Sequence, residues 1–135
     1  MSHWLVKSDP EEFGWKELVR DKTAAWTGVR NFKARGNLKA MKTGDEVLFY
    51  HSQTDKAVVG IAKITGEFYP DPTAPKGEPW VCVDLAPVRP LKNPVTLEQI
   101  KGDKRLSQTY LVRQGRLSVM PLEKEEFELI VGMGQ

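Results

Sequence analysis

The sequence predicts an α+β fold in which a mainly antiparallel sheet curls into a small barrel with short helices at its openings. The expected strands outnumber the expected helices, and few helices are long enough to serve as the crossovers of a parallel α/β fold. A chain of 135 residues is also close to the commonest size of one domain. We therefore expect a single domain over residues 1–135. Strand counting alone leaves an OB-like or another α+β arrangement open.

The N-terminal part of the chain predicts a strand followed by a helix. His3–Val6 reads as a first strand. Asp9–Glu12 then combines an acidic N-cap, a proline at the first helical position and a glutamate at the third. We therefore expect a short helix from this point toward Arg20.

A second helix and a second strand are expected between residues 31 and 51. Asn31 is a good N-cap, and Gly44 is expected to end the helix. Three apolar residues follow at nearly helical spacing: Phe32, Leu38 and Met41. Glu46–His51 is rich in β-branched and aromatic residues, which predicts a strand. Its alternation places Phe49 and His51 on one face and Tyr50 and Ser52 on the other.

The C-terminal part predicts three further strands and two helices. Ala57–Phe68 and Trp80–Val88 are strand candidates, and the proline-rich loop between them cannot join a ladder. Thr96–Gln99 has the pattern of a capping box at the start of a short helix. Leu117–Met120 predicts a late strand, and Leu122–Val131 predicts a terminal helix.

The composition is that of an ordinary globular protein. The sequence has no apolar run long enough to span a membrane and no signal-peptide pattern, so we expect no membrane partner. We expect a monomer in the cytoplasm, or in the nucleus if the source is eukaryotic. The single cysteine, Cys82, lies in an apolar run and is expected to be a buried thiol.

Positive charge is concentrated in two segments. The formal net charge of +2 is too small to drive binding to a polyanion by itself. Residues 30–42, however, contain five basic residues and no acid, and residues 101–116 contain Asp103 as their only acid. The two segments could line one groove for a nucleic acid, or they could be two solvated faces.

The stretch from Trp26 to Ser52 has the composition of a binding pocket. A turn at Gly28 can hold the Trp26 indole at the pocket edge, and Asn31 begins a helix whose first N–H groups face the loop before it. Stacking on an indole, a side-chain amide and nearby arginines are what a protein needs to grip a nucleobase and its backbone.

The same stretch resembles the EVE domain, and the resemblance covers nearly the whole chain. It continues in four further motifs: Trp4–Pro10, Val58–Ala62, Tyr69–Thr73 and Leu111–Pro121. EVE domains belong to the PUA-like superfamily and are related to YTH domains, which read methylated adenine in RNA. The resemblance implies a PUA-like barrel that binds nucleic acid and recognises a modified base, with a modified cytosine as the first expectation. Two positions depart from the family: Phe32 replaces a usual tyrosine, and Gly36 replaces a larger residue.

The resemblance and the local patterns together define a candidate site. The residues expected to line the base pocket are Ser8, Trp26, Val29, Asn31, Tyr50, His51, Trp80 and Ser118. Those expected to contact the nucleic-acid backbone are Lys7, Arg30, Lys33, Arg35, Lys39, Arg113 and Arg116. Structural alternatives exist for several of them, since Asn31 can act only as a helix cap, His51 as a hydrogen-bonded strand residue and Arg113 as a surface residue. We expect Trp4 and Trp15 to be core aromatics.

The sequence shows no catalytic motif, so no catalytic residue, metal or cofactor is expected. His3, His51 and Cys82 are too few and too scattered for a zinc site, and no phosphate loop or nucleophile motif is present. The expected partner is modified DNA or RNA that presents a single-stranded or flipped base. One alternative is a nucleic-acid-processing enzyme of the ASCH-like kind, which could use Lys7, His51 and a carboxylate such as Asp45. Another is a protein-interaction module, expected if the two basic segments do not share a face.

Overall fold

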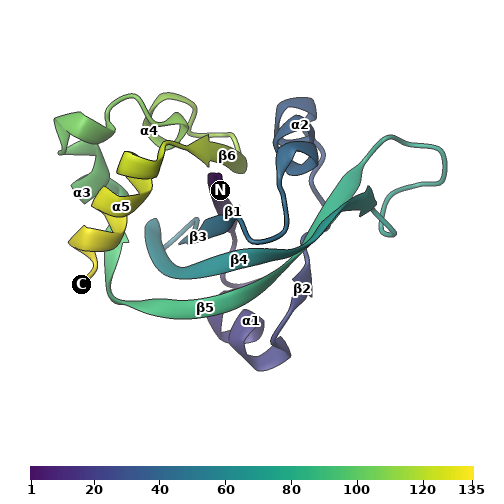
Figure 1. The fold of residues 1–135 in the computed structure, drawn as a ribbon, viewed down its shortest axis with the longest axis horizontal. Helices are drawn as coiled ribbons and strands as arrows, with labels where there is room; N and C mark the ends of the chain where they lie inside the picture. Colours follow the sequence, from purple (N-terminus) through teal and green to yellow (C-terminus); the bar gives the residue numbers. More distant parts are fainter.

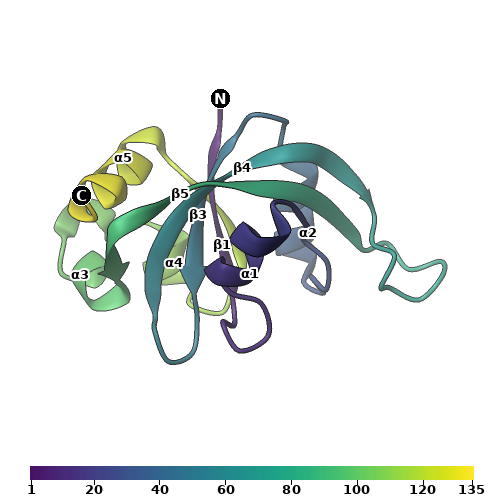
Figure 2. The ribbon, with the colours of Figure 1, turned by 90° about the horizontal axis from the view of Figure 1, so that it is seen from below.

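The computed structural model describes all residues, 1–135, and is built around one curved sheet (Figures 1 and 2). The strands are β1 (His3–Ser8), β2 (Ala24–Ala25), β3 (Glu46–His51), β4 (Ala57–Pro70), β5 (Val81–Thr96) and β6 (Val119–Leu122). Their order is β2-β5-β4-β3-β1-β6, so β2 and β6 are the two ends of a sheet that does not close. Only β1 and β3 pair in parallel. The predicted α+β class and mainly antiparallel, barrel-like sheet are confirmed.

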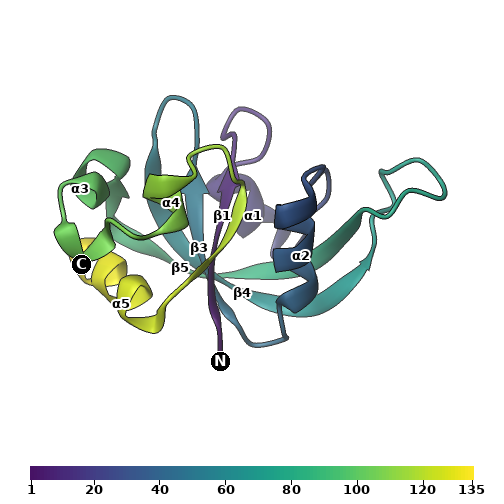
Figure 3. The same cartoon turned by 90° about the horizontal axis from the view of Figure 1, so that it is seen from above.

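Short helices lie around this sheet. They are α1 (Trp15–Asp21), α2 (Phe32–Ala40), α3 (Leu97–Lys101), α4 (Tyr110–Arg113) and α5 (Lys124–Met133), with a 3-10 turn over Lys104–Leu106. Figure 3 shows α3, α4 and α5 gathered at one end of the molecule and α2 on the other side of β1 and β6. The loop between β4 and β5 projects beyond α2 (Figure 1). No helix is both long enough and apolar enough to cross a membrane.

The parallel pair β1 and β3 determines where the site forms. The chain passes through α1, β2 and α2 between them, which provides the crossover that a parallel pair requires. The carboxyl ends of both strands therefore meet at one edge, where Lys7 pairs with Tyr50 and Ser8 pairs with His51. The predicted strand Glu46–His51 is confirmed, and the Phe49 and His51 rings lie 5.7 Å apart on one face.

The first predicted helix begins later than its sequence signal. The Asp9 carbonyl accepts hydrogen bonds from the N–H groups of Glu12 and Phe13, which makes one isolated turn. Gly14 is extended (φ −108°, ψ −176°), so α1 starts only at Trp15. The prediction of a helix start over Asp9–Glu12 is therefore wrong, because the capping signal is used by the turn.

The second helix is shorter than predicted and shows a different face. Asn31 caps it as expected, since its side chain accepts a hydrogen bond from Ala34 N at 3.0 Å. The helix ends at Ala40 rather than Gly44, because Met41 is extended. Gly44 (φ +95°) serves the turn into β3. Phe32, expected on the apolar stripe, is 67% exposed.

The predicted C-terminal elements are present with shifted boundaries. Strand β5 continues to Thr96 through three prolines, because its outer neighbour β2 pairs only with Asp84 and Leu85 and leaves the rest of that edge free. The capping box is confirmed, since Thr96 Oγ1 accepts from Gln99 N at 3.1 Å and Gln99 Oε1 accepts from Thr96 N at 2.8 Å. The late strand and the terminal helix each begin two residues later than predicted.

One hydrophobic core joins both faces of the sheet to the helices. The central strand β3 is buried on both faces, as its continuous apolar sequence requires. Trp4 lies in the core and its Nε1 donates to Asp45 Oδ2 at 2.9 Å. Cys82 is fully buried, as predicted, and burial raises the pKa of its thiol.

Candidate functional site

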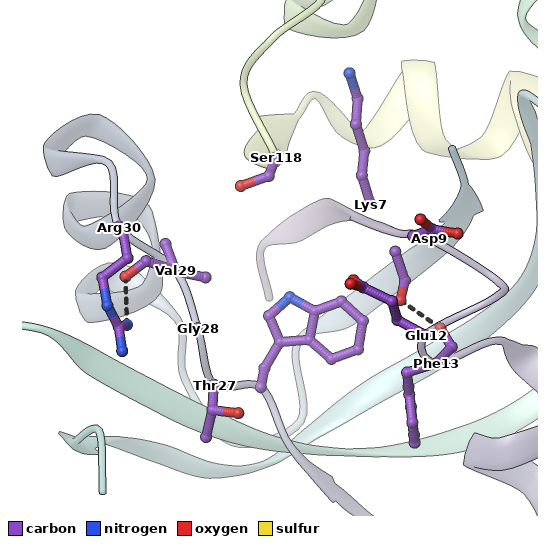
Figure 4. Close-up of a pocket in the computed structure, with 11 residues that line it drawn as sticks. Lys7, Asp9, Glu12, Phe13, Thr27, Gly28, Val29, Arg30 and Ser118 are labelled. Carbon is purple, nitrogen blue, oxygen red and sulfur yellow. Dashed lines mark hydrogen bonds between the residues drawn. The ribbon is translucent and has the colours of Figure 1, made fainter. Parts of the chain in front are cut away.

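A cavity of about 300 Å³ opens at the carboxyl end of β1. It is formed by the end of β1, the turn before α1, the loop between β2 and α2, and the residue before β6 (Figure 4). Its lining consists of Lys7, Ser8, Asp9, Glu12, Phe13, Trp26, Thr27, Gly28, Val29, Arg30 and Ser118. These segments are far apart in the sequence and come together only in the fold.

Trp26 provides the large aromatic surface of this cavity. Its backbone N–H donates to Val83 O at 2.7 Å, which extends the β2–β5 pairing and fixes where the indole enters the fold. The indole packs edge-on against Phe49 and Phe13, with ring centroids 5.5 and 6.3 Å away. Trp26 is only 8% exposed, so it belongs to the core as well as to the cavity.

The indole Nε1 of Trp26 is a free hydrogen-bond donor. This nitrogen has no hydrogen-bond partner within the protein. Every side-chain nitrogen or oxygen that is fully buried does have a partner. The atom must therefore keep access to solvent. Because Trp26 lines the cavity, this access is through the cavity.

Asp71 holds the loop that carries Trp26 and Arg30. Gly28 N donates to Asp71 Oδ2 at 2.8 Å, and Arg30 Nη1 donates to the same oxygen at 3.0 Å. Thr73 supplies two more donors, its backbone N at 2.7 Å and its hydroxyl at 2.6 Å. Burial favours the neutral acid, but hydrogen bonds from Thr73, Gly28 and Arg30 lower the pKa of Asp71 to about 2. Gly28 adopts φ +84°, a conformation that favours glycine.

Charges of both signs face one another in the cavity. Figure 4 shows Asp9 and Glu12 on the side opposite Val29 and Arg30. One Asp9 oxygen accepts from Glu11 N at 2.9 Å, and the Glu12 carboxylate is exposed. The cavity therefore offers hydrogen-bond acceptors as well as donors, which suits a polar ring with both kinds of group.

The structure brings together four of the residues predicted to line a base pocket. Ser8, Trp26, Val29 and Ser118 all line the cavity. The hydroxyl of Ser8 donates to the carbonyl of Phe13, which ties the end of β1 to the turn before α1.

The other four predicted pocket residues lie outside this cavity. The Asn31 side chain caps α2 and lines a neighbouring hollow with Arg116. Tyr50 lines a second cavity, of about 330 Å³, which shares only Lys7 with the first. The centroid of the Trp80 ring lies 4.9 Å from that of the Phe32 ring, and Trp80 Nε1 donates to Glu78 Oε1.

His51 is occupied by structural hydrogen bonds. Its Nε2 accepts from Trp15 N at 3.0 Å, so the ring proton resides on Nδ1, 2.8 Å from Asp55 Oδ2. The ring thereby caps the start of α1. Asp45, the carboxylate of the enzyme alternative, lies before β3, whereas Lys7 pairs with Tyr50 near the other end of that strand. Lys7, His51 and Asp45 therefore do not form one catalytic group.

Four of the seven residues predicted to contact a nucleic-acid backbone lie at the cavity or at the hollow beside it. Lys7 and Arg30 line the cavity, and Lys33 and Arg116 line the hollow beside it. Lys33 Nζ donates to Gln114 Oε1 at 3.0 Å, so the two basic segments meet at the start of α2. Arg35 donates to the Pro79 carbonyl, Lys39 lies over the Phe68 ring, and Arg113 is exposed at the end of α4.

Sequence reasoning missed several lining residues and their support. Asp9, Glu12, Phe13 and Thr27 line the cavity, although none was expected there, and the turn at Gly28, expected at the pocket edge, lines it too. The loop support, Asp71, was also missed. Two signals were available for it, the turn pattern Asp-Pro-Thr and the place of Asp71 within the motif Tyr69–Thr73.

The comparison with known families decides the identity of this fold. The EVE domain profile matches residues 2–133. The chain belongs to the EVE domain family. The predicted resemblance is thereby confirmed.

Relatives of this EVE domain match over almost its full length. Thymocyte nuclear protein 1 from Mus musculus is 37% identical in an alignment 166 residues long. The alignment covers 98% of this chain and 73% of that protein. A crystal structure of a protein from Agrobacterium tumefaciens is 39% identical with a TM-score of 0.96, covering 99% of this chain and 93% of that one. The structure of human THYN1 in complex with 5-methylcytosine containing DNA is 33% identical with a TM-score of 0.92, covering 100% and 98%. An ASCH protein from Zymomonas mobilis is similar in fold alone, with 14% identity and a TM-score of 0.62.

Proposed function

We propose that this EVE domain binds DNA and accepts a 5-methylated cytosine base in the cavity beside Trp26. The observation that carries the proposal is the Trp26 indole, which is held by aromatic rings and has a free N–H facing the cavity. The similarity to human THYN1, whose structure holds DNA of this kind, supports the choice of ligand.

The chemistry of the cavity complements the groups of cytosine. The amino group of cytosine is a donor, for which Asp9 and Glu12 supply carboxylate acceptors. Its ring nitrogen and carbonyl are acceptors, for which Trp26 Nε1 supplies a donor. The Trp26 ring and Val29 supply apolar surface for a methyl group.

The size of the cavity favours a single base rather than a longer segment. Its volume of about 300 Å³ is at the lower end of the range for ligand sites. Because a concave site cannot reach a base stacked in a duplex, the base must be single-stranded or flipped. Flipping costs a few kcal/mol, so we expect single-stranded DNA to bind more tightly than a perfect duplex.

The basic region next to the cavity supports a nucleic acid over a protein partner. A protein-interaction module was the alternative if the two basic segments lay on separate faces. Lys33 and Arg116 line the same hollow, so the segments meet. Phosphates of the strand that carries the base would lie on this region.

We infer that the protein binds the modified base without catalysing a reaction on it. Lys7, His51 and Asp45 do not meet, and no three His, Cys, Asp or Glu side chains form a group that could hold a metal ion. Mass spectrometry of the oligonucleotide after long incubation should return the unaltered base. A new base or strand product would move the protein to the class of enzymes.

A titration with matched single-stranded oligonucleotides tests the proposal. They carry cytosine, 5-methylcytosine, 5-hydroxymethylcytosine, adenine or N6-methyladenine at one position. One buried methyl is worth roughly 0.8 kcal/mol, so 5-methylcytosine should bind about fourfold more tightly than cytosine. Equal affinity for the two, or a preference for N6-methyladenine, would contradict the proposal.

A further inference from the structure

A second cavity, next to the base cavity, carries positive charge without any acid. It is bounded by the ends of β1 and β3, the turn that follows β3, α3 and α4. Three lysines line it, Lys7, Lys56 and Lys101, and no Asp or Glu does. None of the three has a carboxylate within 4.0 Å. This distinguishes the cavity from the base cavity, where two acids face two cations.

Strand pairing and the turn after β3 bring the three lysines to the same cavity. Lys7 and Tyr50 are register partners in the parallel pair β1–β3, so their side chains share one face. The turn after β3 brings Lys56 back to this edge with φ +46°. The Lys56 carbonyl then accepts from Leu97 N at 2.8 Å, which anchors the start of α3 and hence Lys101.

Tyr50 provides a hydrogen-bond donor inside this cavity. The residue is only 3% exposed, and its hydroxyl has no partner in the protein. Since no fully buried side-chain oxygen lacks a partner, the hydroxyl must open onto the cavity that Tyr50 lines. A tyrosine hydroxyl is protonated at neutral pH and is therefore available as a donor, and burial raises the pKa of Tyr50 further.

Lys7 connects the two cavities. It is the one residue that lines both. Its Nζ donates to the Gly115 carbonyl at 2.5 Å and lies 5.6 Å from the centre of the Tyr50 ring. Partial burial lowers the pKa of Lys7, and an anion bound next to its ammonium group would favour the charged form.

We propose that the three-lysine cavity binds a backbone phosphate of the DNA strand whose modified base occupies the cavity beside Trp26. The inference rests on the proposed function and adds a phosphate-binding cavity to the same site. Lys56, Lys101 and Lys7 supply ammonium donors, and Tyr50 supplies a neutral one. Because phosphate contacts carry no sequence information, this cavity sets affinity and register, while the base cavity sets preference.

The test uses two trinucleotides, with thymines on both sides of cytosine or 5-methylcytosine. Each is made with natural phosphates and with an uncharged methylphosphonate at either linkage. The proteins are the wild type, Lys56→Gln/Lys101→Gln, Tyr50→Phe and the control Lys63→Gln. Lys63 is exposed and pairs with Glu46, at the end of β3 opposite to Tyr50.

Methylphosphonate should weaken binding at one of the two linkages, and only in proteins that keep Lys56 and Lys101. We expect methylphosphonate there to weaken wild-type and Lys63→Gln binding about tenfold, since hydrogen bonds to a charged group are worth about 1.5 kcal/mol or more. In Lys56→Gln/Lys101→Gln the same change should weaken binding less than twofold, and Tyr50→Phe should lower affinity about threefold. Undiminished sensitivity to methylphosphonate in the double variant would overturn the inference.

The two proposals fail separately in this design. The ratio between methylated and unmethylated trinucleotides reports on the base cavity, and we expect the double variant to keep it. A ratio of one in the wild type would contradict the proposed function, while the linkage comparison would still decide the lysine cavity. Thermal melts check that the substitutions at exposed lysines leave the fold intact.

Discussion

Trp26→Phe is the substitution that separates the two roles of this indole. Trp26→Ala would remove a nearly fully buried ring, at a cost of about 3–5 kcal/mol in folding free energy. The whole domain has only about 5–15 kcal/mol of stability, so that variant would confuse loss of binding with loss of fold. Phenylalanine keeps an aromatic ring against Phe13 and Phe49 and removes Nε1.

The expected effects of Trp26→Phe follow from what the smaller ring loses. The smaller ring leaves a partial void, so the free energy of unfolding should fall by about 1–2 kcal/mol. Binding loses one hydrogen-bond donor, worth about 0.5–1.5 kcal/mol, and part of a base-stacking surface worth about 1–3 kcal/mol. Together we expect affinity for the 5-methylcytosine oligonucleotide to fall by about five- to thirtyfold.

Isothermal titration and urea unfolding measure the two effects on the same preparation. Trp80→Phe is the matched control, because Trp80 lies outside the cavity and its Nε1 donates to Glu78. That variant should keep the preference for the methylated base. The reasoning is refuted if Trp26→Phe binds as tightly as the wild type, or if Trp80→Phe loses the preference instead.

Four other substitutions test the loop, the packing and the charge. Because the pKa of Asp71 is lowered to about 2, its ionised form stabilises the fold above its ordinary pKa, and the effect is lost as the pH falls toward 2. Urea unfolding should therefore show Asp71→Asn about 2 kcal/mol less stable at neutral pH, with a smaller difference in acid. In thermal melts, Gly36→Ala should stabilise the protein by about 0.5–1 kcal/mol, since no atom lies within 4 Å of the new methyl group. Gly60→Ala should instead destabilise it by about 1–3 kcal/mol, because the new methyl group would lie 2.6 Å from the Trp15 ring. Lys33→Glu should weaken modified and unmodified oligonucleotides equally and flatten the salt dependence of affinity, and selective loss for the methylated one would contradict its backbone role.

Local signals in the sequence predicted local structure well. The strand Glu46–His51 and the caps at Asn31 and Thr96 depend on neighbours within a few residues, and all three are confirmed. The signal at Asp9 failed because a turn and a helix use the same capping chemistry, and the extended Gly14 decides between them.

The candidate site depends on contacts between distant parts of the chain, which local patterns do not encode. Gly28 and Asp71 are 43 residues apart, and their hydrogen bond holds the Trp26 loop. Ser118 and Ser8 line the same cavity only because β6 pairs with β1. His51 was expected beside a base, yet its ring caps α1, a role visible only once Trp15 lies beside it.

The indole N–H resonances measured by NMR during titration with the 5-methylcytosine trinucleotide test the central claim most directly. The chain has four tryptophans, two of whose Nε1 atoms are already bound, to Asp45 and to Glu78. Comparison with Trp26→Phe assigns the Trp26 signal. We predict that this signal moves on binding because its free N–H gains a partner, while the Trp4 and Trp80 signals stay in place. A shift of the Trp80 signal with Trp26 unmoved would contradict the account, since the base would then lie on the exposed Phe32 ring and the half-buried Trp80 ring.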